Sequence, residues 1–191
     1  LDGLHLDYVR FHDSDYGQNP FAVSYFQKNT GISNLPSFDI SQSTQWSDYR
    51  RKAVTELVRE TKNLIQSVKP GITLTAAVKP NLYQARERFF QEWDVWLAAG
   101  YLDKAIVMNY TKDLKEFAAN IDIMYDNLPS KYRKKIVMGI ATYNQSPKNV
   151  VDKIKYTRVT RFNSISFFSY TVFYKDPSYF KSIKNILYPR D

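Results

Sequence analysis

One carboxylate stands where a strand-forming run gives way to a loop. Asp7 follows an apolar run that opens at Leu4, with His5 two residues before it and Arg10 three residues after it. Side chains two apart on a strand share a face, so His5 and Asp7 are expected to be neighbours. Glycosidic hydrolysis needs an acid for the leaving oxygen and a carboxylate that attacks or activates water. Asp7 is a candidate for either role; alternatively, Asp7 and Arg10 form a structural ion pair beside a hydrogen-bonded His5.

Tyrosine and other polar residues recur where the later apolar runs end. A tyrosine offers a sugar ring an apolar face and a hydroxyl at its edge. This pattern predicts a carbohydrate-binding rim, and Trp46, near the start of a long predicted helix, would reach into it or else fix the entry of that helix. The candidate sugar-contacting residues are His5, Tyr8, Arg10, Trp46, Lys79, Asn109, Tyr110, Tyr143 and Tyr170.

The elements that must position these residues alternate between strands and helices. Short apolar runs predict strands at 4–11, 72–78, 105–109, 136–142 and 165–168. Helical spacing of apolar residues predicts helices at 46–68, at 89–97 before Gly100, and at 114–128. Ser146-Pro147 and Asp176-Pro177 have the form of an N-cap followed by a first-turn proline, and the last helix should end near Leu187.

This alternation predicts an α/β fold with parallel strands, either doubly wound or closed as a barrel. With six glycines in the chain and no glycine-rich turn after a strand, a dinucleotide-binding sheet is not expected. A (β/α)8 TIM barrel has eight strands in about 250 residues. Residues 1–191 are therefore interpreted as the C-terminal portion of a single barrel domain, strands four to eight, with strands one to three upstream.

Composition excludes several other classes of function. The chain has no cysteine and two histidines, so neither a thiolate site nor a histidine-rich metal site is expected, and no cofactor is predicted. The formal net charge of +8 comes from basic residues scattered along the chain, which does not predict a nucleic-acid partner. No run approaches the roughly 18 apolar residues of a membrane span.

Residues 2–11, DGLHLDYVRF, resemble the strand-four signature of the glycosyl-hydrolase-like family 10, in which Asp-Gly-x-x-x-Asp-Tyr-x-Arg-Tyr recurs. The helix with Trp46 and Arg50, the turn at 69–71, the stretch 93–103 and the strand end at 108–110 extend the resemblance over residues 1–145. It implies a bacterial barrel glycosidase that is periplasmic, lipid-anchored at the outer surface or secreted. Some relatives act on the glycan strands of peptidoglycan.

Departures from other families limit the mechanism. The same run is similar to the family 18 chitinase signature, but Val9 occupies the place of its catalytic Glu, so that chemistry is excluded. No second carboxylate follows the other predicted strands, and Asp13 and Asp15 are the nearest substitutes. The upstream strands or a substrate acetamido group could supply the missing function. We therefore expect a glycoside hydrolase acting on a polysaccharide or peptidoglycan glycan strand, with a non-catalytic carbohydrate-binding barrel as the alternative.

Overall fold

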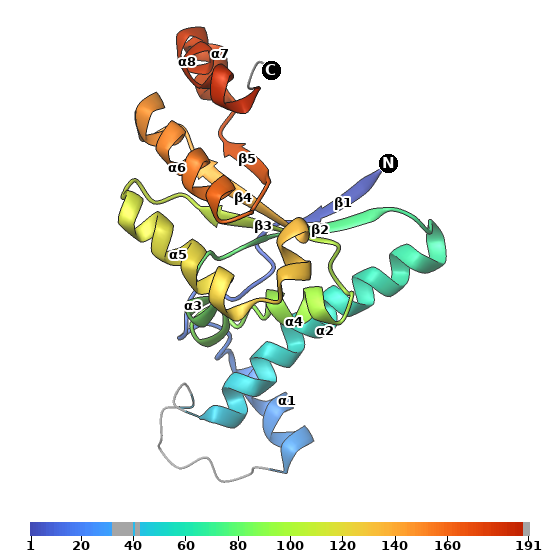
Figure 1. The fold of residues 1–191 in the computed structure, drawn as a ribbon. Helices are drawn as coiled ribbons and strands as arrows, with labels where there is room; N and C mark the ends of the chain where they lie inside the picture. Colours follow the sequence, from blue (N-terminus) through green and yellow to red (C-terminus); the bar gives the residue numbers. More distant parts are fainter. Residues whose placement is uncertain (32–39, 41–42, 189–191) are drawn as a thin grey trace.

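The computed structural model describes residues 1–31, 40 and 43–188 and places five parallel strands in one sheet. The strands are β1 (Gly3–Leu6), β2 (Thr73–Val78), β3 (Lys104–Asn109), β4 (Ile136–Ala141) and β5 (Ser164–Phe168). Their order in the sheet is their order in the chain, β1-β2-β3-β4-β5 (Figure 1). A doubly wound sheet reverses its order at a switch point, whereas a (β/α) barrel adds each strand beside the last. The strand order therefore agrees with the barrel.

The strand register brings the carboxyl ends of the strands to one edge of the sheet. Leu6 pairs with Ala76, Asn109 with Ile140, and Ala141 with Phe168. Because all neighbours are parallel, the residues that follow each strand lie on one rim. This rim carries most of the residues proposed above to bind sugar.

Helices connect the strands and end largely where the sequence predicts. They are α1 (Pro20–Thr30), α2 (Thr44–Val68), α3 (Leu82–Glu87), α4 (Trp93–Ala98), α5 (Leu114–Asn127), the 3-10 helix η2 (Ser130–Lys135), α6 (Pro147–Val159), α7 (Thr171–Lys175) and α8 (Pro177–Leu187). The predicted caps are confirmed, since Ser146 and Asp176 accept hydrogen bonds from the first turns of α6 and α8. The sequence pattern does not predict α1, α3, α7 or the 3-10 helix η2.

Two predicted elements are shorter than expected. The first strand ends at Leu6 instead of residue 11, because Tyr8 has a left-handed backbone (φ 58°) that strand pairing cannot accommodate. The helix predicted from residue 89 begins at Trp93, and Phe89 lies in the turn after α3. Phe90 is also left-handed (φ 53°), which interrupts helical hydrogen bonding at that point.

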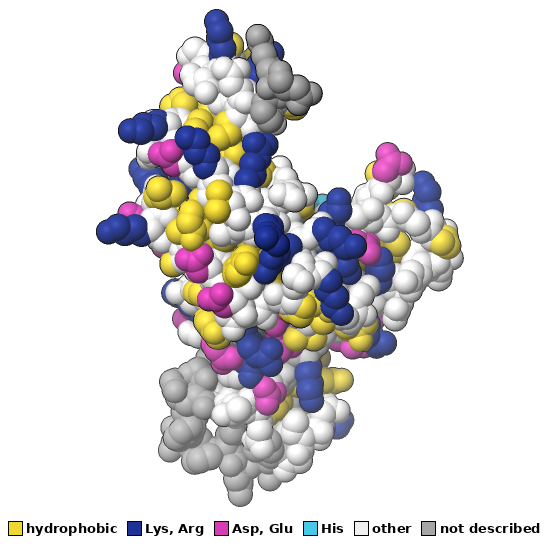
Figure 2. All heavy atoms as spheres, in the orientation of Figure 1, with side chains coloured by type: hydrophobic (Ala, Val, Ile, Leu, Met, Phe, Trp, Pro, Cys, Tyr) yellow, Lys and Arg dark blue, Asp and Glu magenta, His cyan; other side chains and the backbone are white. Residues whose placement is uncertain are grey.

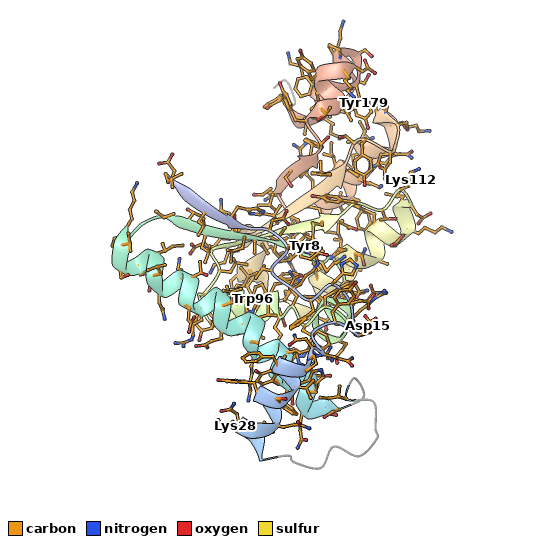
Figure 3. All side chains as sticks on the ribbon, turned by 180° about the vertical axis from the view of Figure 1, so that it is seen from behind. Tyr8, Asp15, Lys28, Trp96, Lys112 and Tyr179 are labelled. Atoms are coloured by element: carbon orange, nitrogen blue, oxygen red, sulfur yellow. The ribbon has the colours of Figure 1, made fainter. Side chains whose placement is uncertain are left out.

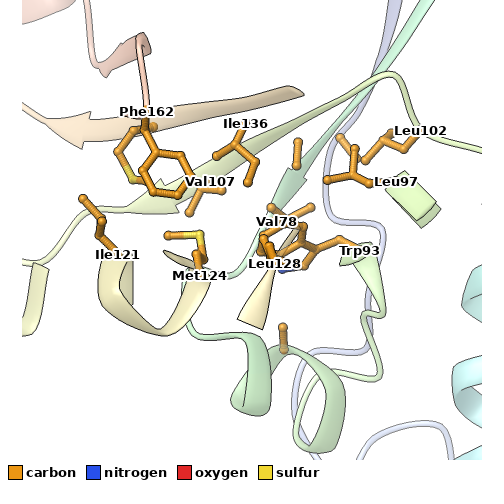
Figure 4. Packing of buried hydrophobic residues seen from close by; sticks show 14 of the residues in the cluster. Val78, Trp93, Leu97, Leu102, Val107, Ile121, Met124, Leu128, Ile136 and Phe162 are labelled. Atoms are coloured by element: carbon orange, nitrogen blue, oxygen red, sulfur yellow. The ribbon is translucent and has the colours of Figure 1, made fainter. Parts of the chain in front are cut away.

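The hydrophobic core lies between the sheet and its covering helices (Figure 4). Val78 and Val107 of the strands, Trp93 and Leu97 of α4, and Met124 of α5 are fully buried or nearly so. A large side chain buried in this way contributes roughly 1.5–3 kcal/mol to folding. The core therefore fixes the strands beneath the rim.

Charged side chains of both signs are interspersed over the face shown in Figure 2. Among the described residues, no helix combines the length and apolar character needed to cross a bilayer.

Candidate active site

Three aromatic side chains form a wall at the ends of β3, β4 and β5. Tyr110 stacks on Phe168 with 5.3 Å between ring centroids, and Tyr143 meets the same ring edge-on at 6.0 Å. Tyr143 is 56% exposed and Phe168 is 53% exposed, so both leave ring surface open to solvent. Exposed, mutually supported rings are suited to packing against the C–H face of a sugar.

A glycine makes room for this wall. A Cβ at Gly139 in β4 would lie 2.9 Å from Cε1 of Tyr110 and 2.5 Å from the carbonyl oxygen of Val107 in β3. Both separations are far shorter than a normal carbon contact. The absence of a side chain at Gly139 therefore allows Tyr110 to lie across β4 and reach Phe168.

Asp7 lies on the same rim as the aromatic wall. It follows β1 directly, is exposed, and its Oδ1 accepts a hydrogen bond from the backbone N–H of Tyr8 at 2.7 Å. Burial raises the pKa of Tyr110, and the negative charge of Asp7 and then Tyr143 raise it further. Asp7, Tyr110 and Tyr143 therefore share one rim, and Tyr110 keeps its hydroxyl proton as a hydrogen-bond donor.

Tyr8 and Arg10 form a second group beside Asp7. The Tyr8 hydroxyl is hydrogen-bonded to Nδ1 of His12, and the guanidinium carbon of Arg10 lies 4.1 Å from the centroid of the Tyr8 ring. In the described part of the chain Arg10 forms no ion pair with Asp7, and its Nε and Nη1 are buried without a hydrogen-bond partner. The Asp7–Arg10 ion pair of the alternative is therefore not formed, although His5 is hydrogen-bonded as that alternative expects, and the carboxylate of Asp7 remains available.

A pocket of about 460 Å³ opens between the ends of β2 and β3. Arg10 and Lys79 supply positive charge to its wall, and Lys79 Nζ lies 4.2 Å from the centroid of the Phe89 ring. Burial lowers the pKa of Lys79, and the nearby charges of Arg10 and Arg88 lower it further. Two cations and one carboxylate, that of Glu116, line the pocket, so its net positive charge favours a ligand that carries negative charge.

Asn109 lines this pocket, but its amide is committed to the protein. Its Nδ2 donates to the carbonyl of Phe117 at 3.0 Å, and its Oδ1 accepts from Nδ2 of Asn120 at 3.0 Å. Asn109 is 1% exposed. It therefore anchors α5 to the end of β3 and shapes the wall beside Tyr110.

Gln91 links the loop after β1 to the end of β2. Its Nε2 donates to the carbonyls of Val9 and Ala77, at 3.1 and 3.2 Å, and its Oε1 accepts from the N–H of Lys79 at 2.8 Å. The side chain is buried, so these three hydrogen bonds do not compete with water. The sequence pattern does not indicate this role of Gln91, because a helix is expected at this position and the structure has the turn between α3 and α4 there.

The contacts that the structure gives for three of the predicted residues lie outside this group. Trp46 is 1% exposed and packs against Phe26 at 5.1 Å, which matches the alternative of a packing residue at the start of α2. His5 lies within β1, and its Nδ1 is 2.8 Å from Oγ1 of Thr75. Tyr170 is 75% exposed beyond β5 and meets Phe173 at 6.4 Å.

The predicted substitutes for a second carboxylate are placed differently from Asp7. Asp13 forms two hydrogen bonds with Arg88, at 2.8 and 2.5 Å, and this guanidinium holds the pKa of Asp13 well below its usual range. Asp15 lies toward α1, away from Tyr8 (Figure 3). Across the described residues, no three His, Asp or Glu side chains gather as metal ligands would.

Glu116 is a pocket-lining carboxylate that pattern reading missed. It contributes to the wall of the pocket that holds Arg10 and Lys79. The spacing from Asp113 to Glu116 is that of a helix start, and Asp113 does cap α5 by accepting from the N–H of Glu116 at 2.8 Å. The carboxylate of Glu116 accepts from the hydroxyl of Thr111. The sequence therefore indicates a helix cap at Glu116 and gives no sign that its side chain lines a pocket.

Comparisons with known proteins agree with this geometry. The family model described as "Glycosyl hydrolase-like 10" matches residues 1–160. The PgaB (BpsB) glycoside hydrolase domain from Bordetella bronchiseptica has a similar structure, with a TM-score of 0.75 at 9% sequence identity. The match covers 100% of this chain and 58% of that domain, so the chain spans less than two thirds of it. No protein with a curated description has a significantly similar sequence. The α/β barrel class is thereby confirmed.

Proposed function

Because the chain belongs to the glycosyl hydrolase-like 10 family, we propose that it forms part of an enzyme that cleaves O-glycosidic bonds in a polysaccharide or peptidoglycan glycan strand. Asp7 is the catalytic carboxylate in this proposal, as acid/base or nucleophile. The observation that supports it is the position of the exposed Asp7 directly after β1, on the same rim as Tyr110 after β3 and the loop after β4 that carries Tyr143.

The aromatic wall supports a sugar ring beside Asp7. Tyr110, Tyr143 and Phe168 provide ring surface, and the Tyr110 hydroxyl can donate a hydrogen bond to a sugar oxygen. Several such contacts would hold the scissile bond within reach of the carboxylate, which lowers the entropic part of the barrier.

The cations of the neighbouring pocket support an acidic sugar in the adjoining subsite. Arg10 has buried, unpartnered N–H groups in the described part of the chain, and Lys79 shares its pocket. The positive charges of Arg10 and Lys79 would attract a carboxylate on the substrate, and a charge-assisted hydrogen bond to either cation would also orient it. The proposed substrate class is therefore a glycan with carboxylated sugar units.

The rival proposal is a carbohydrate-binding barrel without turnover. It is favoured by the ion pair that occupies Asp13 and by the capping contact of Glu116, which leave Asp7 as the freely exposed carboxylate of this group. In the hydrolase proposal the second carboxylate is Glu116, an upstream residue or the substrate's own acetamido group.

The test is Asp7→Asn in the full-length protein, with release of reducing ends measured on peptidoglycan, chitin and plant glycans. Loss of acid–base or nucleophilic chemistry should lower kcat by a factor of about 10² to 10⁴ while sugar affinity changes little. Asp15→Asn removes an equivalent exposed carboxylate and should leave kcat unchanged. Glu116→Gln tests the second role in the same assay.

The two proposals predict different results. A parent protein that binds glycans without releasing reducing ends supports the binding barrel. An Asp7→Asn variant that turns over as fast as the parent refutes the assignment of Asp7.

We also propose that residues 1–191 are the C-terminal portion of a single (β/α)8 domain whose first three strands lie upstream. The cell envelope or the secreted fraction is the proposed location, since glycan strands of this class are found there. Fractionation of the native host, followed by detection of the protein, tests the second proposal.

A further inference from the structure

A second pocket lies at the opposite end of the strands from Asp7. Two segments form it: η2, which leads into β4, and residues 161–164, which lead into β5. The parallel register pairs Val137 with Ser164, so the two segments enter the sheet side by side. Lys and Arg side chains gather near the middle of the face in Figure 2, where the segment between α5 and β4 lies in Figure 1.

The wall of this pocket is strongly basic. Four cationic side chains and three neutral polar residues line a volume of about 420 Å³, and no carboxylate lines it. None of the four cations forms an ion pair within residues 1–31, 40 and 43–188. The lining residues are Ser130, Lys131, Arg133, Lys134, Arg161, Asn163 and Ser164.

Two of the arginines are held in place by the fold. The guanidinium carbon of Arg133 lies 3.9 Å from the centroid of the Tyr125 ring, and its buried Nε has no hydrogen-bond partner in the described part of the chain. Arg161 has a left-handed backbone (φ 64°), and its N–H donates to the carbonyl of Arg158 at 2.9 Å. This turn directs the chain from α6 into β5 and brings Arg161 to the pocket wall.

We propose that this pocket binds a phosphate group. Guanidinium groups match the geometry of phosphate oxygens, and lysines add charge without a directional requirement. Ser130, Asn163 and Ser164 can donate further hydrogen bonds, as sites for tetrahedral anions commonly provide. The phosphate group belongs to a soluble phosphate ester or to a phospholipid headgroup. The pocket is separate from the rim, so this proposal does not depend on catalysis at Asp7.

The test titrates the full-length protein with inorganic phosphate in a calorimeter, with acetate as the comparison anion. The double variant Lys134→Ser/Arg161→Asn removes two charges, and asparagine tolerates the left-handed backbone at position 161. We expect its Kd for phosphate to rise about tenfold, and that of Lys134→Ser alone about threefold. Lys148→Ser/Lys181→Ser removes the same charge from exposed sites on α6 and α8 and should leave the Kd unchanged.

A vesicle arm distinguishes the two sources of phosphate. Co-sedimentation with phosphatidylglycerol vesicles that inorganic phosphate reverses identifies a headgroup, and phosphate binding without co-sedimentation identifies a soluble ester. Equal weakening in both double variants, acetate affinity equal to phosphate affinity, or no phosphate binding by the parent protein would each overturn the proposal.

Discussion

Gly139→Ala tests whether the aromatic wall depends on the space at β4. The added Cβ would lie 2.5 Å from the backbone oxygen of Val107, which belongs to a paired strand and cannot move freely. Overpacking of this kind costs about 1–3 kcal/mol of stability. For a domain of roughly 150–250 residues, each kcal/mol lowers the Tm by about 2–4 °C.

The same substitution should weaken sugar binding, because Cε1 of Tyr110 would lie 2.9 Å from the new methyl group. Displacement of Tyr110 from Phe168 would remove one ring from the wall that faces the sugar, and a lost ring contact of about 0.5–1.5 kcal/mol with the sugar corresponds to roughly a two- to tenfold rise in Kd. Thermal unfolding measures the first effect. Calorimetry measures the second, with the fragment that the parent protein binds best from peptidoglycan, chitin or plant glycans.

Gly100→Ala is the matched control for this experiment. Gly100 has φ 75° and no atom within 4 Å of an added Cβ, so alanine adds backbone strain of about 1–2 kcal/mol without a clash. It should lower the Tm and leave sugar affinity unchanged. If Gly139→Ala leaves both quantities unchanged, the packing argument is refuted; if it lowers the Tm alone, the role of Tyr110 in binding is refuted.

Three further outcomes are expected. Phe168→Ala should raise the Kd for glycans about two- to tenfold in calorimetry, since it removes the ring on which Tyr110 stacks; an unchanged Kd would exclude the wall from binding. Lys153→Met should lower the free energy of unfolding in urea by about 1–3 kcal/mol, because the buried Nζ bonds three oxygens from two loops, and an unchanged midpoint would contradict this. A hydrogen bond to Asp122 raises the pKa of Tyr156 to about 12, so the stability gained there should be complete below pH 10 and lost as the pH rises toward 12. Tyr156→Phe should remove this loss of the free energy of unfolding between about pH 10 and 12. A variant with the same pH profile as the parent would refute the role of the Tyr156 hydroxyl.

The strands were predictable because burial on both faces demands apolar runs, and four of the five begin and end close to their expected bounds. The first strand was overextended because the left-handed conformation of Tyr8 has no signal in residue type. Phe90 interrupts the predicted helix for the same reason. In both places the backbone is held by tertiary contacts that a pattern in one chain does not contain.

The candidate site was predictable only in part. The places of Asp7, Tyr110 and Tyr143 after strands follow from the apolar runs, and the structure has all three on the same rim of the sheet. Phe168 lies at the end of an apolar strand and Glu116 has the spacing of a helix cap, so neither position has a sequence signal for a binding site. Trp46 has a side chain typical of sugar sites, but its environment is a buried aromatic cluster that sequence spacing does not reveal.

The hydrogen bonds of Gln91 limit how far the rim can move when a ligand binds. Since one uncharged side chain bonds both the Val9 carbonyl and the Lys79 amide, the loop after β1 and the end of β2 cannot separate without breaking buried hydrogen bonds. This part of the rim should therefore be rigid, and the fixed separation of the two segments should select among sugars by size. Any movement on ligand binding should be confined to the outer aromatic residues. Because an amide does not titrate in the pH range in which carboxylates do, the hydrogen bonds of Gln91 and this separation should persist at acidic pH.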